Sequence, residues 1–131
     1  MMQLSIFLEN EKGRLAYALN LLAEFNVNIQ ALSLADTKDY GVLRIIVANP
    51  EEVAQQLREH NCVVKLTPVW VLKVPDSSGG LAGVLDKLVN EGVIVEYLYA
   101  YVEKANEQAQ VVLRVRDTAI MQAAMDKLKL E

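Results

Sequence analysis

Two short turns hold the residues whose types and spacing could bind a small charged molecule. The first reads Asn10-Glu11-Lys12-Gly13-Arg14-Leu15, and the second reads Asp76-Ser77-Ser78-Gly79-Gly80-Leu81. Each turn precedes a predicted helix, whose first backbone N–H groups lack partners and carry partial positive charge. A carboxylate could rest on those amides while Asn10 or Asp76 meets an ammonium group, a pairing that recognises the common part of an α-amino acid. Short turns also contain Gly, Asp and Ser for conformational reasons alone, so the turns by themselves leave both interpretations open.

The elements that must position these turns follow from hydrophobic periodicity. Alternating apolar residues predict strands, and apolar residues at three-to-four spacing predict helices. In the first half of the chain, the sequence predicts a strand at 3–8, a helix at 14–25, strands at 27–35 and 42–48, a helix after the Asn49 cap, and a strand at 62–66. In the second half, it predicts a strand at 70–74, a helix from Leu81 that ends at Glu91-Gly92, strands at 93–102 and 111–116, and a helix after Asp117.

This order of elements is an internal repeat. A shift of 66 residues places Gly13 on Gly79 and Leu22 on Leu88, and a shift of 68 places Asn49 on Asp117. Each copy reads β-α-β-β-α-β, the ferredoxin-like order, with both helices on one face of an antiparallel sheet. We therefore predict an α+β protein of two tandem ferredoxin-like βαββαβ units, residues 1–67 and 68–131, the second unit lacking its last strand.

The second unit also predicts an edge that needs a neighbour. The position that matches Val63 is Glu131, so no fourth strand follows the last helix. An unpaired strand edge is an aggregation hazard, and we expect another segment or another chain to fill it. Neither face of the predicted strands at 27–35 and 42–48 is polar throughout, so we also expect the face without helices to be partly covered.

The two turns and the elements around them resemble the ACT domain, a small regulatory module that binds amino acids. The first copy matches through N-x-x-G-R-L, the helix and V-N-I, and the second through D-x-x-G-G-L and G-V-I-V-E-Y. The resemblance covers essentially the whole chain as a small stand-alone tandem ACT protein. It implies a regulatory function as an amino-acid sensor, a homodimer formed by side-by-side pairing of ACT units, and an effector between the Gly-containing turn of one unit and a strand of its partner.

The resemblance also implies which residues contact the ligand. Carried over position by position, the candidates are Asn10, Lys12, Gly13, Arg14, Leu15, Asn28 and Ile29 in the first copy, and Asp76, Ser78, Gly79, Gly80, Leu81, Val95 and Glu96 in the second. Many ACT turns carry Pro immediately before the Gly, where this chain has Lys12 and Ser78. The first turn is basic and the second is built from small residues, so the two sites need not bind the same ligand.

Charge and composition exclude several classes of protein. The net charge of −4 argues against a nucleic-acid partner and against a polybasic membrane patch. No apolar run reaches the length of a membrane-spanning helix, and no signal peptide is recognisable, so we expect a cytoplasmic protein. Cys62 is the only cysteine and His60 the only histidine, which is too few ligands for a structural zinc site. We expect no cofactor and no metal.

Three alternatives stay open. A ligand-free interaction module that docks a partner enzyme would share the same fold. Acylphosphatases have the same element order and use an Arg and an Asn, which Arg14 and Asn28 superficially match, but the glycine-rich phosphate loop is absent and we expect no enzymatic activity. The row Tyr97, Tyr99 and Tyr101 could stack on RNA bases, although the acidic charge favours packing between sheets or subunits.

Overall fold

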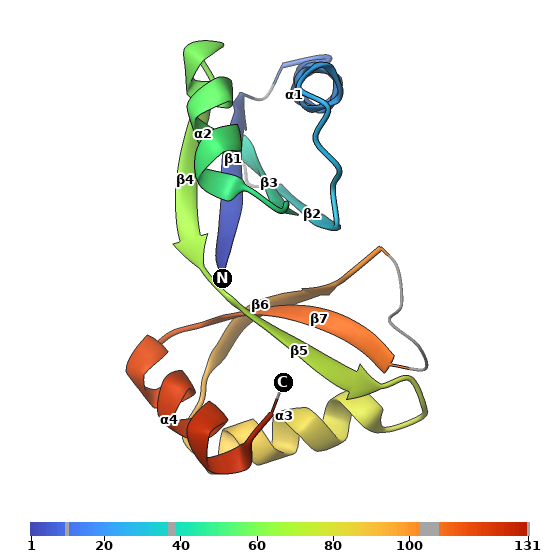
Figure 1. Cartoon of the computed structure of the whole chain (residues 1–131), viewed down its shortest axis with the longest axis vertical. Coiled ribbons are helices and arrows are strands. Elements are labelled where there is room, and N and C mark those ends of the chain that lie inside the picture. The colour runs from blue at the N-terminus through green and yellow to red at the C-terminus, as the bar shows by residue number, and fades with distance from the viewer. Residues whose placement is uncertain (10, 37–38, 103–107, 131) are drawn as a thin grey trace. The chain divides into compact units, whose positions relative to one another are not determined.

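The computed structural model describes residues 1–9, 11–36, 39–102 and 108–130. The chain divides into two compact units (Figure 1), Met2–Pro68 and Met1 with Val69–Glu131. Each unit has its own sheet and its own helices.

The first unit is a four-stranded antiparallel sheet with two helices on one face (Figure 1). Its elements are β1 (Met2–Glu9), α1 (Arg14–Glu24), β2 (Ala31–Asp36), β3 (Tyr40–Ile46), α2 (Pro50–Glu59) and β4 (Val63–Pro68). The strands lie in the order β2-β3-β1-β4, so β1 and β3 are central and β2 forms an edge. The turn that follows β1 therefore leaves the middle of the sheet.

Alternation along β1 separates the two faces of this sheet. Leu4, Ile6 and Leu8 point into the core with the apolar faces of α1 and α2, as the period-two pattern predicts. The intervening residues Gln3 and Ser5 are buried on the opposite face. There the Gln3 Nε2 donates to Ser5 Oγ at 2.9 Å, and the Ser5 and Thr67 hydroxyls are hydrogen-bonded at 3.0 Å. The buried polar groups on the helix-free face thus have hydrogen-bond partners.

The second unit repeats this plan with one strand fewer. Its elements are β5 (Trp70–Pro75), α3 (Gly80–Asn90), β6 (Val95–Ala100), β7 (Gln108–Val115) and α4 (Thr118–Leu128). Within the described residues its sheet has three strands, in the order β5-β7-β6. The predicted fold class, with the second unit lacking a last strand, is confirmed. That another segment or chain fills the edge beside β5 stays a prediction.

The repeat extends to the backbone conformation. Among the described residues, three positions in each unit adopt positive φ angles, and they correspond at shifts of 66, 66 and 68 residues. The pairs are Gly13 and Gly79 at 84° and 81°, Asn26 and Gly92 at 58° and 85°, and Asn61 and Lys129 at 64° and 54°. Each pair marks the start or end of a helix, where the left-handed conformation turns the chain sharply. The internal repeat is therefore structural as well as sequential.

Two predicted strands begin too early. The sequence predicts extended chain from Val27, but β2 begins at Ala31; likewise β6 spans Val95–Ala100 rather than 93–102. After α1 the chain turns at Asn26 and crosses to the sheet edge before it pairs, and Gln30 N–H is the group that first reaches the Ile46 carbonyl, at 2.9 Å. Asn28 and Ile29 consequently lie in a loop, not in a strand as predicted.

Candidate functional site

The first turn presents an open helix start. Gly13 is the residue before α1, and its φ of 84° requires the left-handed conformation that glycine adopts without strain. Among the described residues, no side chain caps this helix. Arg14 N–H reaches the Glu11 carbonyl at 3.3 Å, and Tyr17 N–H makes the first helical hydrogen bond to Gly13. The intervening amides of Leu15 and Ala16 precede the first possible intrahelical bond, so they remain available to an acceptor.

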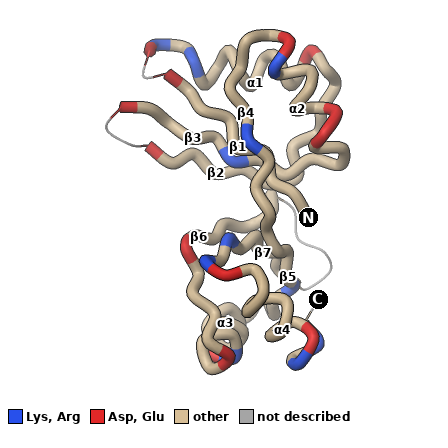
Figure 2. The backbone as a smooth tube through the Cα atoms, turned by 90° about the vertical axis from the view of Figure 1, so that its left-hand side faces the viewer, with Lys and Arg blue, Asp and Glu red and all other residues tan. Residues whose placement is uncertain are grey.

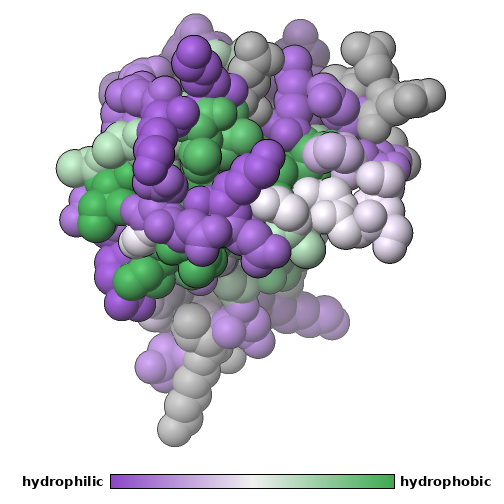
Figure 3. All heavy atoms as spheres, turned by 90° about the horizontal axis from the view of Figure 1, so that it is seen from below, coloured by the Kyte–Doolittle hydropathy of each residue, from purple (hydrophilic) through white to green (hydrophobic). Residues whose placement is uncertain are grey.

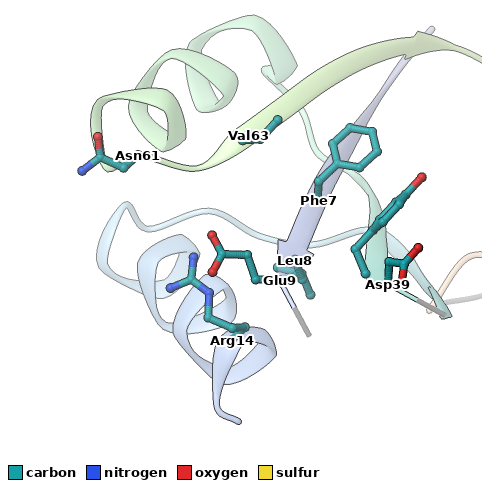
Figure 4. A pocket seen from close by; sticks show the side chains of 8 residues that line it. Phe7, Leu8, Glu9, Arg14, Asp39, Asn61 and Val63 are labelled. Carbon is teal, nitrogen blue, oxygen red and sulfur yellow. The ribbon is translucent and has the colours of Figure 1, made fainter. Parts of the chain in front are cut away.

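Arg14 carries a buried side-chain nitrogen, Nε, that lacks a hydrogen-bond partner among the described residues. The guanidinium carbon lies 5.1 Å from the centre of the Tyr17 ring, which holds the side chain over one face of α1. Figure 4 shows the guanidinium extending towards Asn61, with the carboxylate of Glu9 beside it. A buried donor without an acceptor is costly, and an acceptor from a ligand would remove that cost.

Arg14 lies between two hollows. The first has a volume of about 200 Å³ and opens towards the sheet edge, lined by Leu8, Glu9, Glu11, Arg14, Leu15, Leu34, Asp36 and Gly41. The second has a volume of about 230 Å³ and lies beyond Arg14, lined by Phe7, Leu8, Glu9, Arg14, Asp39, Tyr40, Asn61 and Val63 (Figure 4). Both are smaller than the roughly 300–1,000 Å³ pockets of drug-sized ligands, which suits a molecule the size of an amino acid.

Charges of both signs surround these hollows. Acidic positions lie at the ends of β1 and β2 and just before β3, and basic positions lie in the first turn (Figure 2). Glu9 borders both hollows, Asp36 the first and Asp39 the second. An anionic group at Arg14 and a cationic group at the surrounding carboxylates would each find an opposite charge. The arrangement therefore matches a zwitterion.

The pKa of the Cys62 thiol depends on the charge of Arg14. Burial raises the pKa of the Cys62 thiol, and the nearby Arg14 guanidinium opposes this by favouring the thiolate. The thiol also points at the His60 carbonyl, with its sulfur 3.9 Å away. Cys62 is thus protonated at neutral pH, as expected of a structural cysteine rather than a nucleophile.

The second turn has the same backbone start but is closed. Gly79 has a φ of 81° and, like Gly13, leaves the following helix without a side-chain cap among the described residues. Gly80, which replaces Arg14 in the repeat, packs against Pro75. A Cβ at Gly80 would overlap the Pro75 carbonyl oxygen and lie 3.0 Å from its carbon. Gly80 is therefore needed for a close approach of two backbone segments, a structural role for which a ligand is not required.

The remaining predicted residues fall in different places. Asn10 lies outside the described residues. Lys12 is exposed in the first turn, Asp76 and Ser78 are exposed in the second, and Leu81 is half-buried in the core of the second unit. The structure brings together Gly13, Arg14 and Leu15 at the first turn.

The candidates before β2 and at the start of β6 lie away from the turns of their own units. Asn28 borders a third hollow of about 320 Å³ near Asn26 and Asn49, at the other end of α1. Val95 packs on the core of the second unit, and Glu96 lies at an irregularity in the β6–β7 pairing, where its carboxylate is 3.8 Å from Arg114 Nε. Within one unit, Asn28 and Ile29 are therefore separated from Gly13 by the length of a helix.

Sequence reasoning missed the residues that form the walls of the hollows. The sequence pattern places Phe7 in the predicted strand at 3–8 and does not single out Glu9 or Tyr40. What brings these residues together is the pairing of β1 with β3, which places Glu9 opposite Tyr40 and Phe7 opposite Val42. The register of this pairing cannot be read from either strand alone.

Over the described ranges, no group of three or more His, Cys, Asp or Glu side chains is placed to hold a metal ion. No helix among those residues is long and apolar enough to cross a membrane.

Comparisons with known proteins agree with the tandem repeat. Residues 1–128 match the family described as ACT domain pair. Protein BT0572 from Bacteroides thetaiotaomicron is 37% identical with a TM-score of 0.90, over 99% of this chain and 89% of that chain. The ligand-free regulatory subunit of aspartate kinase from Thermus thermophilus is 14% identical with a TM-score of 0.67, over 98% and 90%.

Aspartokinase alpha and beta subunits are 14% identical with a TM-score of 0.58, over 96% of both chains, and at this identity the two kinase structures show likeness of fold alone. A search of the curated proteins finds no match. Because the family match spans nearly the whole chain, this protein belongs to the family of ACT domain pairs.

Proposed function

We propose that this protein is a non-catalytic regulator that senses an amino acid at its first turn. The observation that carries the proposal is the buried Arg14 Nε, which has no hydrogen-bond partner among the described residues, beside a helix start that none of their side chains caps. The ligand carboxylate accepts from Arg14 and from the free amides of α1, where the helix dipole favours negative charge. Its ammonium group faces Glu9 and Asp36, which border the same hollow.

The regulatory role is supported by the family and by the two solved structures of similar fold, whose names describe a regulatory subunit and kinase subunits. Within the described residues, the site contains no nucleophile paired with a base. The single histidine has its Nδ1 3.0 Å from the Gln56 carbonyl, and Cys62 is held protonated by burial. Binding therefore changes the conformation or assembly of the protein rather than the ligand.

A homodimer would complete the site. Apolar side chains lie along the edge strand β2 and the start of α1, a surface that we name the β2 strip: Leu15, Tyr17, Leu32 and Leu34. Leu32 and Leu34 expose 43% and 51% of their surfaces. Exposed apolar side chains on an edge strand favour pairing with a second strand. Pairing of β2 with β2 of a second copy would extend the sheet and bring Asn28 and Ile29 of that copy towards the first turn.

The experiment for sensing is a thermal-shift screen of the full chain against the twenty amino acids at millimolar concentration. A ligand at a hundred times its dissociation constant stabilises the folded state by about 2.7 kcal/mol, which raises the melting temperature by several degrees. No shift with any amino acid would contradict the proposal.

The experiment for dimerisation is light scattering coupled to size-exclusion chromatography. Leu34→Lys places a charge within the β2 strip and should yield monomers, whereas Val89→Lys, at a side chain that is 62% exposed in the second unit, should leave the dimer intact. A dimer that survives Leu34→Lys would show that the β2 strip is not the interface.

A ligand-free module that docks a partner enzyme is the second candidate, and the second unit favours it. Val89, Ile94 and Ile120 are exposed there. Figure 3, which views the molecule from the side of α3 and α4, shows apolar surface broken up by polar side chains. Under this alternative no amino acid stabilises the protein, and Val89→Lys rather than Arg14→Gln abolishes capture of the partner.

A further inference from the structure

The hollow beyond Arg14 has no role in the binding of the amino and carboxylate groups. Those groups are held on the side of α1 and β2, whereas this second hollow lies between the end of β1, the start of β3 and the start of β4 (Figure 4). Arg14 and Glu9 border both spaces. Arg14 and Glu9 therefore link the first hollow to the second, where Phe7 and Val63 lie on the opposite face of the sheet from Leu8.

The wall of this hollow is apolar and aromatic. Phe7 and Tyr40 lie with their ring centres 5.9 Å apart and their planes tilted by 56°. Pairing of β1 with β4 places Val63 opposite Phe7, which continues the wall on the other side. Val63 remains 65% exposed and contributes to no core cluster. An apolar group placed against these three side chains would remove their surface from water, which is favourable.

The charges around the hollow select against acidic side chains. Among the described residues that line it, the carboxylates are those of Glu9 and Asp39, and the cation is Arg14. A ligand carboxylate at the α-position uses Arg14, so a second carboxylate would meet Glu9 and Asp39 with no further cation among these lining residues. A neutral side chain avoids this repulsion.

We propose that the ligand sensed at the first turn is an α-amino acid with a neutral, apolar or aromatic side chain, which packs against Phe7, Tyr40 and Val63. This inference rests on the proposed function, because it assumes that Arg14 holds the ligand carboxylate. It adds a side-chain subsite on the far side of Arg14 and excludes aspartate and glutamate as the preferred ligands.

Isothermal titration of the full chain tests the proposal with leucine, methionine, phenylalanine, aspartate, glutamate and lysine. The dissociation constants of the first three should be at least about tenfold lower than those of aspartate and glutamate, because an acidic side chain loses hydration on the apolar wall and is repelled by Glu9 and Asp39. Lysine tests the wall against these two carboxylates, and tightest binding of lysine would show that the carboxylates select the ligand. Val63→Asp should weaken binding of the apolar ligands by about tenfold or more for the same reason. Val89→Asp is the matched control, with the same substitution at a similarly exposed valine of the other unit.

A second variant keeps the test independent of the new charge. Tyr40→Ser removes a ring from the wall without adding a charge, and it should weaken binding of phenylalanine more than binding of any polar amino acid. Circular dichroism of each variant confirms folding before titration.

The outcomes separate the two proposals. If apolar amino acids bind and both Val63→Asp and Tyr40→Ser weaken them, the subsite is supported. Tightest binding of a charged amino acid, or unchanged binding in both variants, overturns the subsite while leaving amino-acid sensing intact. If no amino acid binds the unaltered protein, both proposals fail together.

Discussion

The two turns of this protein share a backbone conformation but differ in what surrounds the residue after the turn glycine. Gly13 and Gly79 adopt nearly the same φ, and α1 and α3 both begin without a side-chain cap among the described residues. The next position decides the difference. Arg14 has a long side chain whose Nε lies buried between two hollows, whereas Gly80 lets the chain close against the Pro75 carbonyl. A repeated motif can thus preserve a helix start while the residue after the glycine contacts different surroundings in each copy.

The largest expected effect tests whether the second turn is closed. Gly80→Ala forces a methyl group against the Pro75 backbone, and we expect a loss of about 2–4 kcal/mol of stability. Gly83→Ala is the matched control: the position lies inside α3 with open space around it, so alanine should stabilise by about 0.5–1 kcal/mol.

Urea unfolding followed by the fluorescence of Trp70, the single tryptophan of the chain, reports on the second unit. Equal stabilities for Gly80→Ala and Gly83→Ala would show that the turn is not packed as described.

The next effect concerns the open turn. Arg14→Gln removes the cation that holds the ligand carboxylate, and we expect amino-acid affinity to fall by about 1.5–3 kcal/mol, roughly 10–150-fold. Stability in the absence of ligand should change little, because the Arg14 Nε has no hydrogen-bond partner to lose among the described residues. Lys12→Gln removes the same charge from an exposed residue two positions earlier and should weaken binding far less. Titration calorimetry distinguishes the two variants.

A smaller effect contrasts the helix starts that carry no cap with the one that does. Asp117 caps α4 by accepting from the amides of Ala119 at 2.9 Å and Ile120 at 3.2 Å. Asp117→Ala should therefore cost about 1 kcal/mol.

Asn49 occupies the same position before α2, but its Nδ2 donates to Glu52 at 2.7 Å and its side chain accepts from no backbone amide of the helix. Asn49→Ala should cost less than Asp117→Ala in chemical denaturation. A larger loss at Asn49 would contradict the assigned hydrogen bonds.

The smallest effect uses Cys62 as a sensor of Arg14. Because the guanidinium charge favours the thiolate, Arg14→Gln should raise the pKa of the Cys62 thiol further above its ordinary value. A bound carboxylate at Arg14 should raise this pKa in the same direction by neutralising the charge. The measurement is the pH profile of Cys62 alkylation, and a pKa that falls in Arg14→Gln would exclude the assigned proximity.

The sequence alone predicts the repeat and the helices of this fold well. Leucines and turn glycines that recur at a shift of 66 place α1 and α3, and the Asp117 cap predicts the start of α4. The sequence pattern fails where pairing between strands sets the boundary of an element. The pattern from Val27 is apolar enough for a strand, but pairing begins only where the chain reaches β3, at Ala31.

The site is less predictable than the fold for the same reason. Gly13 and Arg14 follow from the turn pattern, but the pocket wall depends on the register that sets Phe7 against Val42 and Val63. The close approach of Gly80 to Pro75 also needs coordinates, since a glycine in a turn has several possible roles.

The measurement that tests the account most directly is the stoichiometry of amino-acid binding in titration calorimetry, with the unaltered protein and with Arg14→Gln. The account predicts one ligand per chain for the unaltered protein, bound at the first turn, and a dissociation constant at least about tenfold higher for Arg14→Gln. Two ligands per chain, or a single ligand retained with unchanged affinity in Arg14→Gln, would contradict it.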